Sequence, residues 1–195
     1  DEAVVLSGLR RGVTIGSVVG IDLNGGAIEA ARVRAESQGL SSRVRFEVGD
    51  FMEATDLGTF DLVLMVRLLT CFPALPSWRE LLHRAWSALE QRGLIYVNDF
   101  VVTPESTVYR GRYEDGARRG WRPGNFRVED GAGRLTFVAH HHSEEDLKEI
   151  TAPYTQVELT YRRSQSMNGN ECKMFEFIGR KAGKAPEVRS DSSEG

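Results

Sequence analysis

The sequence predicts an α/β fold with a Rossmann-like, mostly parallel sheet that is flanked by helices and ends in an antiparallel β-hairpin. Two observations predict it. Between residues 17 and 100, short apolar runs alternate with segments of helical periodicity, a pattern typical of parallel strands joined by right-handed crossovers. Near the end, two long alternating runs (155–166 and 171–179) flank the turn signal "MNGNE", which predicts the hairpin.

Length and composition are those of one ordinary globular domain. The chain has 195 residues, 41% of them hydrophobic and 27% charged, which suffices for a single buried core. A net charge of −3 gives no reason to expect a nucleic-acid partner. No apolar run approaches the ~18 residues that a membrane span needs. The two cysteines lack metal-ligand spacing and suggest reduced thiols in a cytoplasmic protein.

The first elements lie before residue 40. Residues 1–12 have the pattern of a helix end, because two arginines precede Gly12. The stretch "SVVGID" (17–22) is a short apolar run typical of a buried parallel strand. Asn24 is suited to cap the helix that follows, and Gly39 is suited to end it.

Three more strands complete the parallel part. The run "RVRFEVGDF" (43–51) alternates as a strand, while "TFDLVLMV" (59–66) and "LIYVNDF" (94–100) are nearly continuous apolar runs. A helix is predicted between the last two, because residues 76–93 carry an apolar stripe at helical spacing. We expect it to begin with a capping box and to end at a glycine; these residues are Ser77, Glu80 and Gly93.

The composition changes after residue 100, where the chain becomes polar and rich in glycine and arginine. We expect residues 1–181 to form one domain that contains this polar segment as an insertion. The predicted parts are an inserted lid or hairpin segment (103–142) that turns at Gly131–Gly133, a helix (143–150) capped by Ser143, the two hairpin strands (155–166 and 171–179) and a disordered tail (182–195).

The carboxyl ends of the predicted strands carry the residues best suited to bind a ligand, because ligands of open parallel sheets bind there. An acid follows three of the four strands. The ends are Asp22–Leu23, Gly49–Asp50–Phe51, Met65–Val66–Arg67 and Asn98–Asp99. A carboxylate can accept hydrogen bonds from both hydroxyls of a ribose, and Asp22 is placed for this. The alternative is that Asp22 only caps the next helix.

The triplet "GDF" supports the interpretation that Asp22 binds a ribose. Asp50 can accept a hydrogen bond from an exocyclic amine, and Phe51 can lie against a flat base. Gly49 allows the ligand to approach the backbone closely. Because Asp50 follows Asp22 by 28 residues, with one helix and one strand between them, the two acids together predict an adenosine site.

These motifs resemble those of class I S-adenosylmethionine-dependent methyltransferases. "VVGIDLN" resembles that family's ribose-binding second strand, "VRFEVGDF" its adenine-binding third strand, and "FDLVLMVRLLTCFP" its fourth strand and following loop. "LEQRGLIYVNDF" resembles the passage into the fifth strand, and the closing hairpin also matches the family. The resemblance implies S-adenosylmethionine as cofactor. The implied cofactor-binding residues are Asp22, Leu23, Gly49, Asp50, Phe51, Met65 and Val66.

The same resemblance implies a first strand with a glycine loop before the first helix. Only four residues, 13–16, separate Gly12 from the strand at 17–22, and no helix fits into so short a segment. Residues 1–12 therefore align with the first helix itself. We expect the first strand and its glycine loop to lie upstream of Asp1.

An acceptor site is expected around Arg67 and the insertion. The family often faces its substrate just after the fourth strand, and an arginine there can hold a carboxylate or phosphate; the alternative is an ordinary surface arginine. The insertion interleaves arginines with aromatic residues, which suits a lid, although it can also be a solvated loop. The candidate acceptor-binding residues are Arg67, Tyr109, Tyr113, Trp121 and His142.

Two further features carry weaker hypotheses. The triplet "HHH" (140–142) suggests a metal, but consecutive strand residues point to opposite faces, and we expect no metal site. Asp99 is suited to act as a base or to orient a hydroxyl, although a capping role is favoured. No single catalytic residue is identified, because a sulfonium methyl is already activated.

The function predicted is methyl transfer from S-adenosylmethionine to a small-molecule acceptor, in a cytoplasmic protein with neither a nucleic-acid nor a membrane partner. Two alternatives remain open. One is a non-catalytic module with the same fold, which the absent glycine loop would suit. The other is a nicotinamide-dependent oxidoreductase, since such enzymes share the ribose-binding acid.

Overall fold

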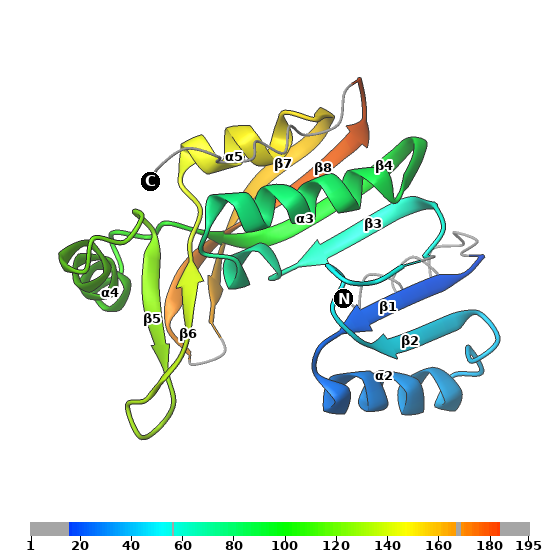
Figure 1. Ribbon diagram of the computed structural model, residues 1–195, viewed down its shortest axis with the longest axis horizontal. Coiled ribbons are helices and arrows are strands. Elements are labelled where there is room, and N and C mark those ends of the chain that lie inside the picture. Colours follow the sequence, from blue (N-terminus) through cyan, green and yellow to red (C-terminus); the bar gives the residue numbers. More distant parts are fainter. Residues whose placement is uncertain (1–15, 56, 167–168, 184–195) are drawn as a thin grey trace. The chain divides into compact units, whose positions relative to one another are not determined.

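The structure is a computed structural model that describes residues 16–55, 57–166 and 169–183. It divides into two compact units, residues 1–57 and 58–195, which are considered separately here (Figure 1). The predicted helix end at 1–12 lies outside the described residues, as does most of the predicted tail. No helix in the described ranges has the length and apolar character required to cross a bilayer.

The first unit is one βαβ motif (Figure 1). Strand β1 (Val18–Asp22) pairs in parallel with β2 (Val44–Val48), and helix α2 (Gly25–Ser37) connects them. The predicted cap is confirmed, because the Asn24 side chain accepts hydrogen bonds from the backbone N–H groups of the first helical turn. This cap ends β1 sharply and turns the chain directly into α2.

The second unit is built on a four-stranded sheet with the order β3-β4-β8-β7. Its strands are β3 (Phe60–Val66), β4 (Leu89–Val101), β7 (Tyr154–Gln165) and β8 (Glu171–Lys181). Strands β3 and β4 are parallel, whereas β4–β8 and β8–β7 are antiparallel. The sheet is therefore mixed and the expectation of a mostly parallel sheet is wrong for this unit, because the predicted terminal hairpin inserts β8 directly beside β4.

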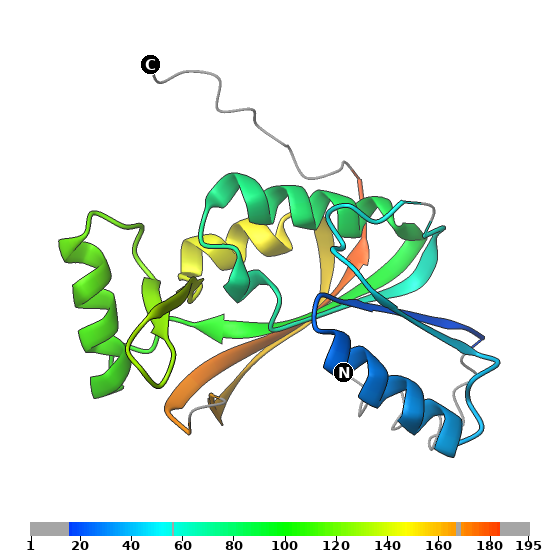
Figure 2. The same cartoon turned by 60° about the horizontal axis from the view of Figure 1, so that its bottom comes forward.

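Two helices cover one face of this sheet (Figure 2). They are α3 (Leu75–Ser87) and α5 (Glu144–Thr151). Trp78, Leu81 and Leu82 of α3 are fully buried, as are Ile95 of β4 and Phe175 of β8. Each such side chain contributes roughly 1.5–3 kcal/mol by leaving water, so this layer forms the core of the second unit.

The limits of α3 differ from the prediction at both ends. The helix begins at Leu75 after Ala74, which makes no side-chain cap, so the predicted capping box of Ser77 is wrong. It ends at Ser87, and Gly93 lies within β4. The left-handed residue is Arg92, with φ of 72°. Gly93 serves a close approach instead, since a Cβ there would lie 3.1 Å from the Phe60 carbonyl oxygen.

The insertion between β4 and α5 contains three elements. They are helix α4 (Thr107–Arg118) and the antiparallel pair β5 (Asn125–Glu129) and β6 (Leu135–His140). The predicted hairpin is confirmed, and its turn places Gly133 at φ of 76°. Helix α4 was not predicted, because Gly111 and Gly116 lower its helix propensity. A short 3-10 helix, η1 (Leu69–Cys71), follows β3.

The start of α5 is as predicted. The Ser143 hydroxyl accepts the N–H of Asp146, and the Asp146 carboxylate accepts the N–H of Ser143. This reciprocal pair is a capping box. It fixes the end of β6 to the first turn of α5, where the chain crosses from the insertion back to the sheet.

Candidate functional site

The ends of β1 and β2 bring the two predicted adenosine-binding acids next to each other. The strands are in register up to Asp22 and Val48, and the Gly49 N–H donates to the Asp22 carbonyl at 3.1 Å. Asp50 follows directly. The exposed Asp22 carboxylate accepts the Asn24 N–H on Oδ1 at 2.8 Å. Within the part of the chain that the structure describes, no group occupies Oδ2, which is available to a ligand.

Asp50 is fixed by a local turn. Its Oδ1 accepts the Met52 N–H at 2.8 Å, and its carbonyl accepts two further N–H groups, of Glu53 and Ala54. Phe51 is half-buried. At Gly49 a Cβ would meet no atom nearer than 3.9 Å, so packing does not demand a glycine there. The absence of a side chain instead leaves the strand end open.

Leu23 gives this edge an apolar surface. It is 72% exposed, directly after Asp22 at the strand end. An exposed apolar group, a free carboxylate oxygen and a second acid on the neighbouring strand suit a nucleoside, which has a flat base, an amine and a diol. The residues of the first unit therefore fit the adenosine half of S-adenosylmethionine by their chemistry.

In the second unit, the ends of β3 and β4 hold the predicted residues Met65, Val66 and Arg67. Met65 is buried and Val66 half-buried, whereas Arg67 is exposed. The Arg67 N–H donates to the Asn98 carbonyl at 2.7 Å. Its φ is 53°, which costs a residue with a Cβ roughly 1–2 kcal/mol. The guanidinium lies 5.7 Å from the centre of the Phe100 ring, and this cation–π contact directs the side chain back across β4.

Asp99 has no exposed surface, and its carboxylate accepts hydrogen bonds from backbone N–H groups. Oδ2 accepts the Thr70 N–H at 3.0 Å and Oδ1 accepts the Phe100 N–H at 2.8 Å. Burial raises the pKa of Asp99 to about 7, although these hydrogen bonds and Arg67 oppose the rise. The contacts fit the capping role that the sequence favours, since Asp99 secures η1 to the end of β4.

Two predicted acceptor contacts, Tyr109 and Tyr113, lie within a buried aromatic cluster of the insertion. Tyr109 is only 2% exposed. The Tyr113 hydroxyl accepts the Thr103 N–H and lies 2.7 Å from Nδ1 of His141. Burial raises the pKa of Tyr113 and lowers that of His141 to about 3, so both groups are neutral near pH 7. This cluster joins α4 and the β5–β6 hairpin to the end of β4.

Trp121 is the remaining aromatic candidate of the insertion, and it is half-buried. Its backbone N–H donates to the Gly116 carbonyl at 3.0 Å. The Arg119 guanidinium lies 5.7 Å from the ring centre. Part of the indole therefore remains accessible at the C-terminal end of α4.

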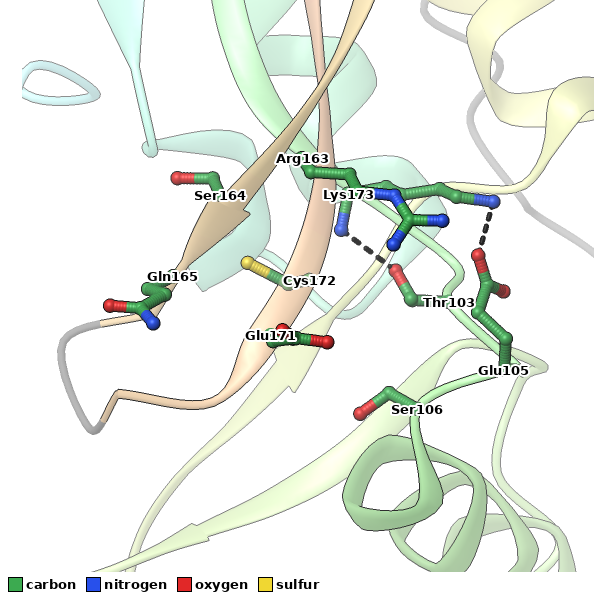
Figure 3. Close-up of a pocket in the computed structure, with 9 residues that line it drawn as sticks. All are labelled: Thr103, Glu105, Ser106, Arg163, Ser164, Gln165, Glu171, Cys172 and Lys173. Carbon is green, nitrogen blue, oxygen red and sulfur yellow. Dashed lines mark hydrogen bonds and ion pairs between the residues drawn. The ribbon is translucent and has the colours of Figure 1, made fainter.

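The ends of β4 and β7 and the start of β8 enclose a surface pocket of about 360 Å³ (Figure 3). Lys173 forms an ion pair with Glu105, and its backbone N–H donates to the Thr103 hydroxyl at 3.0 Å. Arg163 and Glu171 also line the pocket. Two cations and two carboxylates give it mixed charge, which suits a small polar molecule better than an apolar one.

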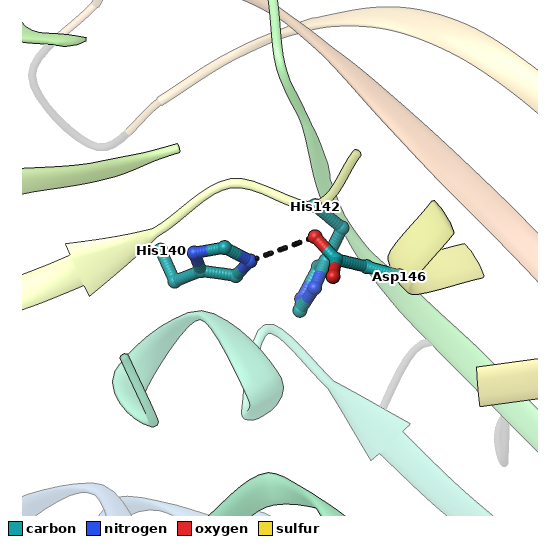
Figure 4. A group of neighbouring side chains, drawn as sticks. All are labelled: His140, His142 and Asp146. Atoms are coloured by element: carbon teal, nitrogen blue, oxygen red, sulfur yellow. Dashed lines mark hydrogen bonds and ion pairs between the residues drawn. The ribbon is translucent and has the colours of Figure 1, made fainter. Parts of the chain in front are cut away.

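The last predicted acceptor contact, His142, is 1% exposed and belongs to a different group of side chains. His140 and His142 point to the same side of the chain, and Asp146 of α5 meets them there (Figure 4). Only the middle histidine faces the aromatic cluster. Alternation along a strand excludes three consecutive ligands, but it allows the alternate pair His140 and His142, which was not predicted. The signal that would have found it is the spacing H-x-H-x3-D, which joins a strand end to the third residue of a helix.

Comparison with known proteins gives one family match. The family model described as "Methyltransferase domain" matches residues 6–153. Among curated proteins, no sequence is significantly similar to this chain.

Solved structures with a similar fold include three methyltransferases. An S-adenosylmethionine-dependent methyltransferase from Methanosarcina mazei has a TM-score of 0.76 at 24% identity, over 92% of this chain and 86% of its own. The N-methyltransferase NodS from Bradyrhizobium japonicum, solved with S-adenosyl-L-homocysteine, has a TM-score of 0.56 at 16% identity, over 86% and 67%. The 1,6-didemethyltoxoflavin-N1-methyltransferase from Burkholderia thailandensis has a TM-score of 0.57 at 16% identity, over 93% and 77%.

Proposed function

Because this chain belongs to the methyltransferase-domain family, we propose that it transfers a methyl group from S-adenosylmethionine to a small-molecule acceptor. The cofactor supplies a methyl group on a sulfonium, which is already activated for transfer. The work of the protein is then to bind both partners, to align them at about 3 Å and to exclude water. The observation that carries the proposal is the pair of acids on adjacent strand ends, Asp22 and Asp50, beside an exposed leucine.

We assign the adenosine half of the cofactor to the first unit. The free Oδ2 of Asp22 accepts from the ribose hydroxyls, while Oδ1 remains on the Asn24 N–H. Asp50 accepts from the adenine amine. Leu23 and Phe51 contact the faces of the base, and Gly49 keeps the backbone open for its approach. In the second unit, the assignment of Met65 and Val66 to cofactor binding stays a prediction from the sequence.

The acceptor is assigned to the second unit. Arg67 is exposed at the end of β3 and offers a guanidinium for a carboxylate or phosphate, and Trp121 offers part of an aromatic face. Tyr109 and His142 are buried, and Tyr113 is partly buried with its hydroxyl engaged by Thr103 and His141, so we assign them to shaping the insertion rather than to direct contact. The mixed-charge pocket at the ends of β4 and β7 supports a polar acceptor. A cytoplasmic location and the absence of nucleic-acid and membrane partners remain predictions.

Calorimetric titration of the purified chain with S-adenosylmethionine, S-adenosylhomocysteine and NAD tests the proposal. We expect both sulfur compounds to bind with a stoichiometry near one and NAD not to bind. Failure of both sulfur compounds would favour a non-catalytic module. Binding of NAD alone would favour an oxidoreductase.

A further inference from the structure

A buried group of two histidines and one aspartate remains outside the proposed methyl-transfer site. His140 ends β6, His142 lies two residues beyond it, and Asp146 is in the first turn of α5 (Figure 4). Each offers one ligand atom, and these atoms all lie within 4.8 Å of one another. None of the three side chains is exposed by more than a few per cent. We propose that His140, His142 and Asp146 bind a divalent transition-metal ion, with Zn²⁺ as the best-suited ion.

The hydrogen bonds of His140 orient it as a metal ligand. Its Nδ1 lies 2.6 Å from Oδ1 of Asn125, whose Nδ2 donates to the Pro73 carbonyl. Oδ1 is therefore the acceptor, and the ring proton is assigned to Nδ1. The Nε2 lone pair then faces Oδ2 of Asp146 at 3.1 Å. Two facing lone pairs repel each other, and either a proton on Nε2 or a metal ion between them removes this repulsion. A hydrogen-bond acceptor on the ring nitrogen that does not bind the ion is the usual support of a metal-bound imidazole.

His142 provides the independent observation. It is 1% exposed, and neither of its ring nitrogens has a hydrogen-bond partner in the described structure. A buried polar group without a partner is costly, and such groups are rare in native proteins. The ring lies 4.9 Å from that of His140, edge to face. A metal ion bound by both rings would satisfy His142 and would also separate His140 from the carboxylate.

The donor set and its spacing suit zinc. Two imidazoles and a carboxylate are common zinc ligands, at metal distances of about 2.0–2.2 Å. With Nε2 of His140 and Oδ2 of Asp146 3.1 Å apart, such distances correspond to an angle of about 100° at the ion. His142 must move closer by a side-chain rotation. The buried indole N–H of Trp78, whose ring centre lies 6.3 Å from that of His142, also lacks an acceptor in the described structure.

Arg122 is the group that competes with the ion. Its Nη2 pairs with Oδ1 of Asp146, while Nη1 lies 3.3 Å from Nε2 of His140. The first contact holds the carboxylate by Oδ1, while Oδ2 accepts the Ser143 N–H and keeps a second lone pair for the ion. The contact of Arg122 with His140 must be given up. The Arg122 side chain is 24% exposed, so it can withdraw toward solvent. Metal binding is therefore coupled to a movement of Arg122, and the bound ion would link β6 to α5.

The test uses the full chain after removal of metal with a chelator. Calorimetric titration with Zn²⁺ should give one site with a dissociation constant of micromolar or tighter, and a higher Tm at saturation. Substitution His142→Gln should weaken binding at least tenfold. The matched control is His83→Gln, on α3 and outside the cluster, which should bind as the parent does. Circular dichroism establishes that both variants are folded.

A measurement on the unaltered chain is independent of variant folding. X-ray absorption at the zinc edge should show two imidazole nitrogens bound to the ion. The proposal is overturned if the parent chain binds no Zn²⁺, if the spectrum shows fewer than two imidazoles, or if the folded His142 and His83 variants bind alike. None of these outcomes depends on methyl transfer, so the metal site and the proposed function stand or fall separately.

Discussion

The carbonyl oxygen of Asp22 accepts the N–H of Gly49 at 3.1 Å. This single bond continues the parallel ladder one residue past the end of β2. It therefore sets the acid that ends β1 beside the acid that follows β2. The Asn24 cap then turns the chain away into α2, which leaves the Asp22 carboxylate exposed at the edge. An adenosine site at this edge follows from strand pairing rather than from either acid alone.

Substitution Asp22→Asn should weaken binding of S-adenosylhomocysteine by about 1–3 kcal/mol, which is roughly 5- to 150-fold. The amide oxygen can still accept the Asn24 N–H, so the cap of α2 is retained. The loss is that of a charged acceptor for the ribose. Isothermal titration calorimetry measures it, with Glu29→Gln as the control because it removes one exposed charge from α2. Equal affinities of the two variants would remove the ribose assignment.

The backbone conformation at the end of β3 reverses the usual order of stability of a glycine and an alanine variant. Arg67 has a φ of 53°, a conformation that glycine adopts without the Cβ penalty. Both Arg67→Gly and Arg67→Ala remove the contact with the Phe100 ring, so they differ only in the backbone. Arg67→Gly should be more stable than Arg67→Ala by about 1 kcal/mol. Urea unfolding compares them, and the ordinary order, with alanine more stable, would contradict the left-handed geometry.

Two glycines of α4 should respond oppositely to alanine. At Gly116 a Cβ would lie 2.3 Å from the Asn125 carbonyl oxygen, whereas at Gly111 nothing lies within 4 Å. Gly116→Ala must push α4 away from β5 and should destabilise the fold by about 1–3 kcal/mol. Gly111→Ala should stabilise it by about 0.5–1 kcal/mol through helix propensity. Thermal unfolding of both variants checks the packing of α4; destabilisation by Gly111→Ala would argue against it.

Asp99 should make the second unit less stable as the pH rises from about 4 to 7. Its pKa is raised from 3.8 to about 7 in the folded state, mainly by burial, so the folded chain holds a proton that the unfolded chain has lost. Stability therefore falls across this window, by up to about 4 kcal/mol. Asp99→Asn carries no such proton, and its unfolding free energy should lack this component.

The measurement for Asp99 is urea unfolding of the parent and the Asn variant at pH 5 and pH 8. Other titrating groups are shared, so the difference between the two chains isolates Asp99. The parent should lose more stability than the variant between these two pH values. The same pH dependence in both chains would mean that Asp99 is ionised throughout.

Local signals in the sequence predicted the elements whose ends are set by side chains. Asn24 and Ser143 cap helices as expected, because each side chain has a free N–H within reach. The predicted capping box at Ser77 is wrong because the N-cap of α3 is Ala74, three residues earlier. The sequence pattern predicts a helix end at Gly93, but the lack of a side chain there instead allows close packing against the Phe60 backbone. A glycine needed for space and one needed for a left-handed turn look alike in a sequence.

Long-range pairing was less accessible from the sequence. The terminal hairpin was predicted correctly, but nothing local shows that β8 lies beside β4 and makes that sheet mixed. The sequence pattern predicts acceptor contacts for the aromatic residues of the insertion, whereas the structure packs the buried Tyr109 and the partly buried Tyr113 against His141. The cluster of His140 with Asp146 joins two elements, so only their packing brings it together.

A crystal structure of the chain with S-adenosylhomocysteine tests the central claim most directly. The account predicts an Asp22 carboxylate oxygen within about 2.5–3.0 Å of a ribose hydroxyl, and Asp50 within hydrogen-bond reach of the adenine amine. A complex in which the ligand is bound but neither carboxylate contacts the nucleoside would contradict it.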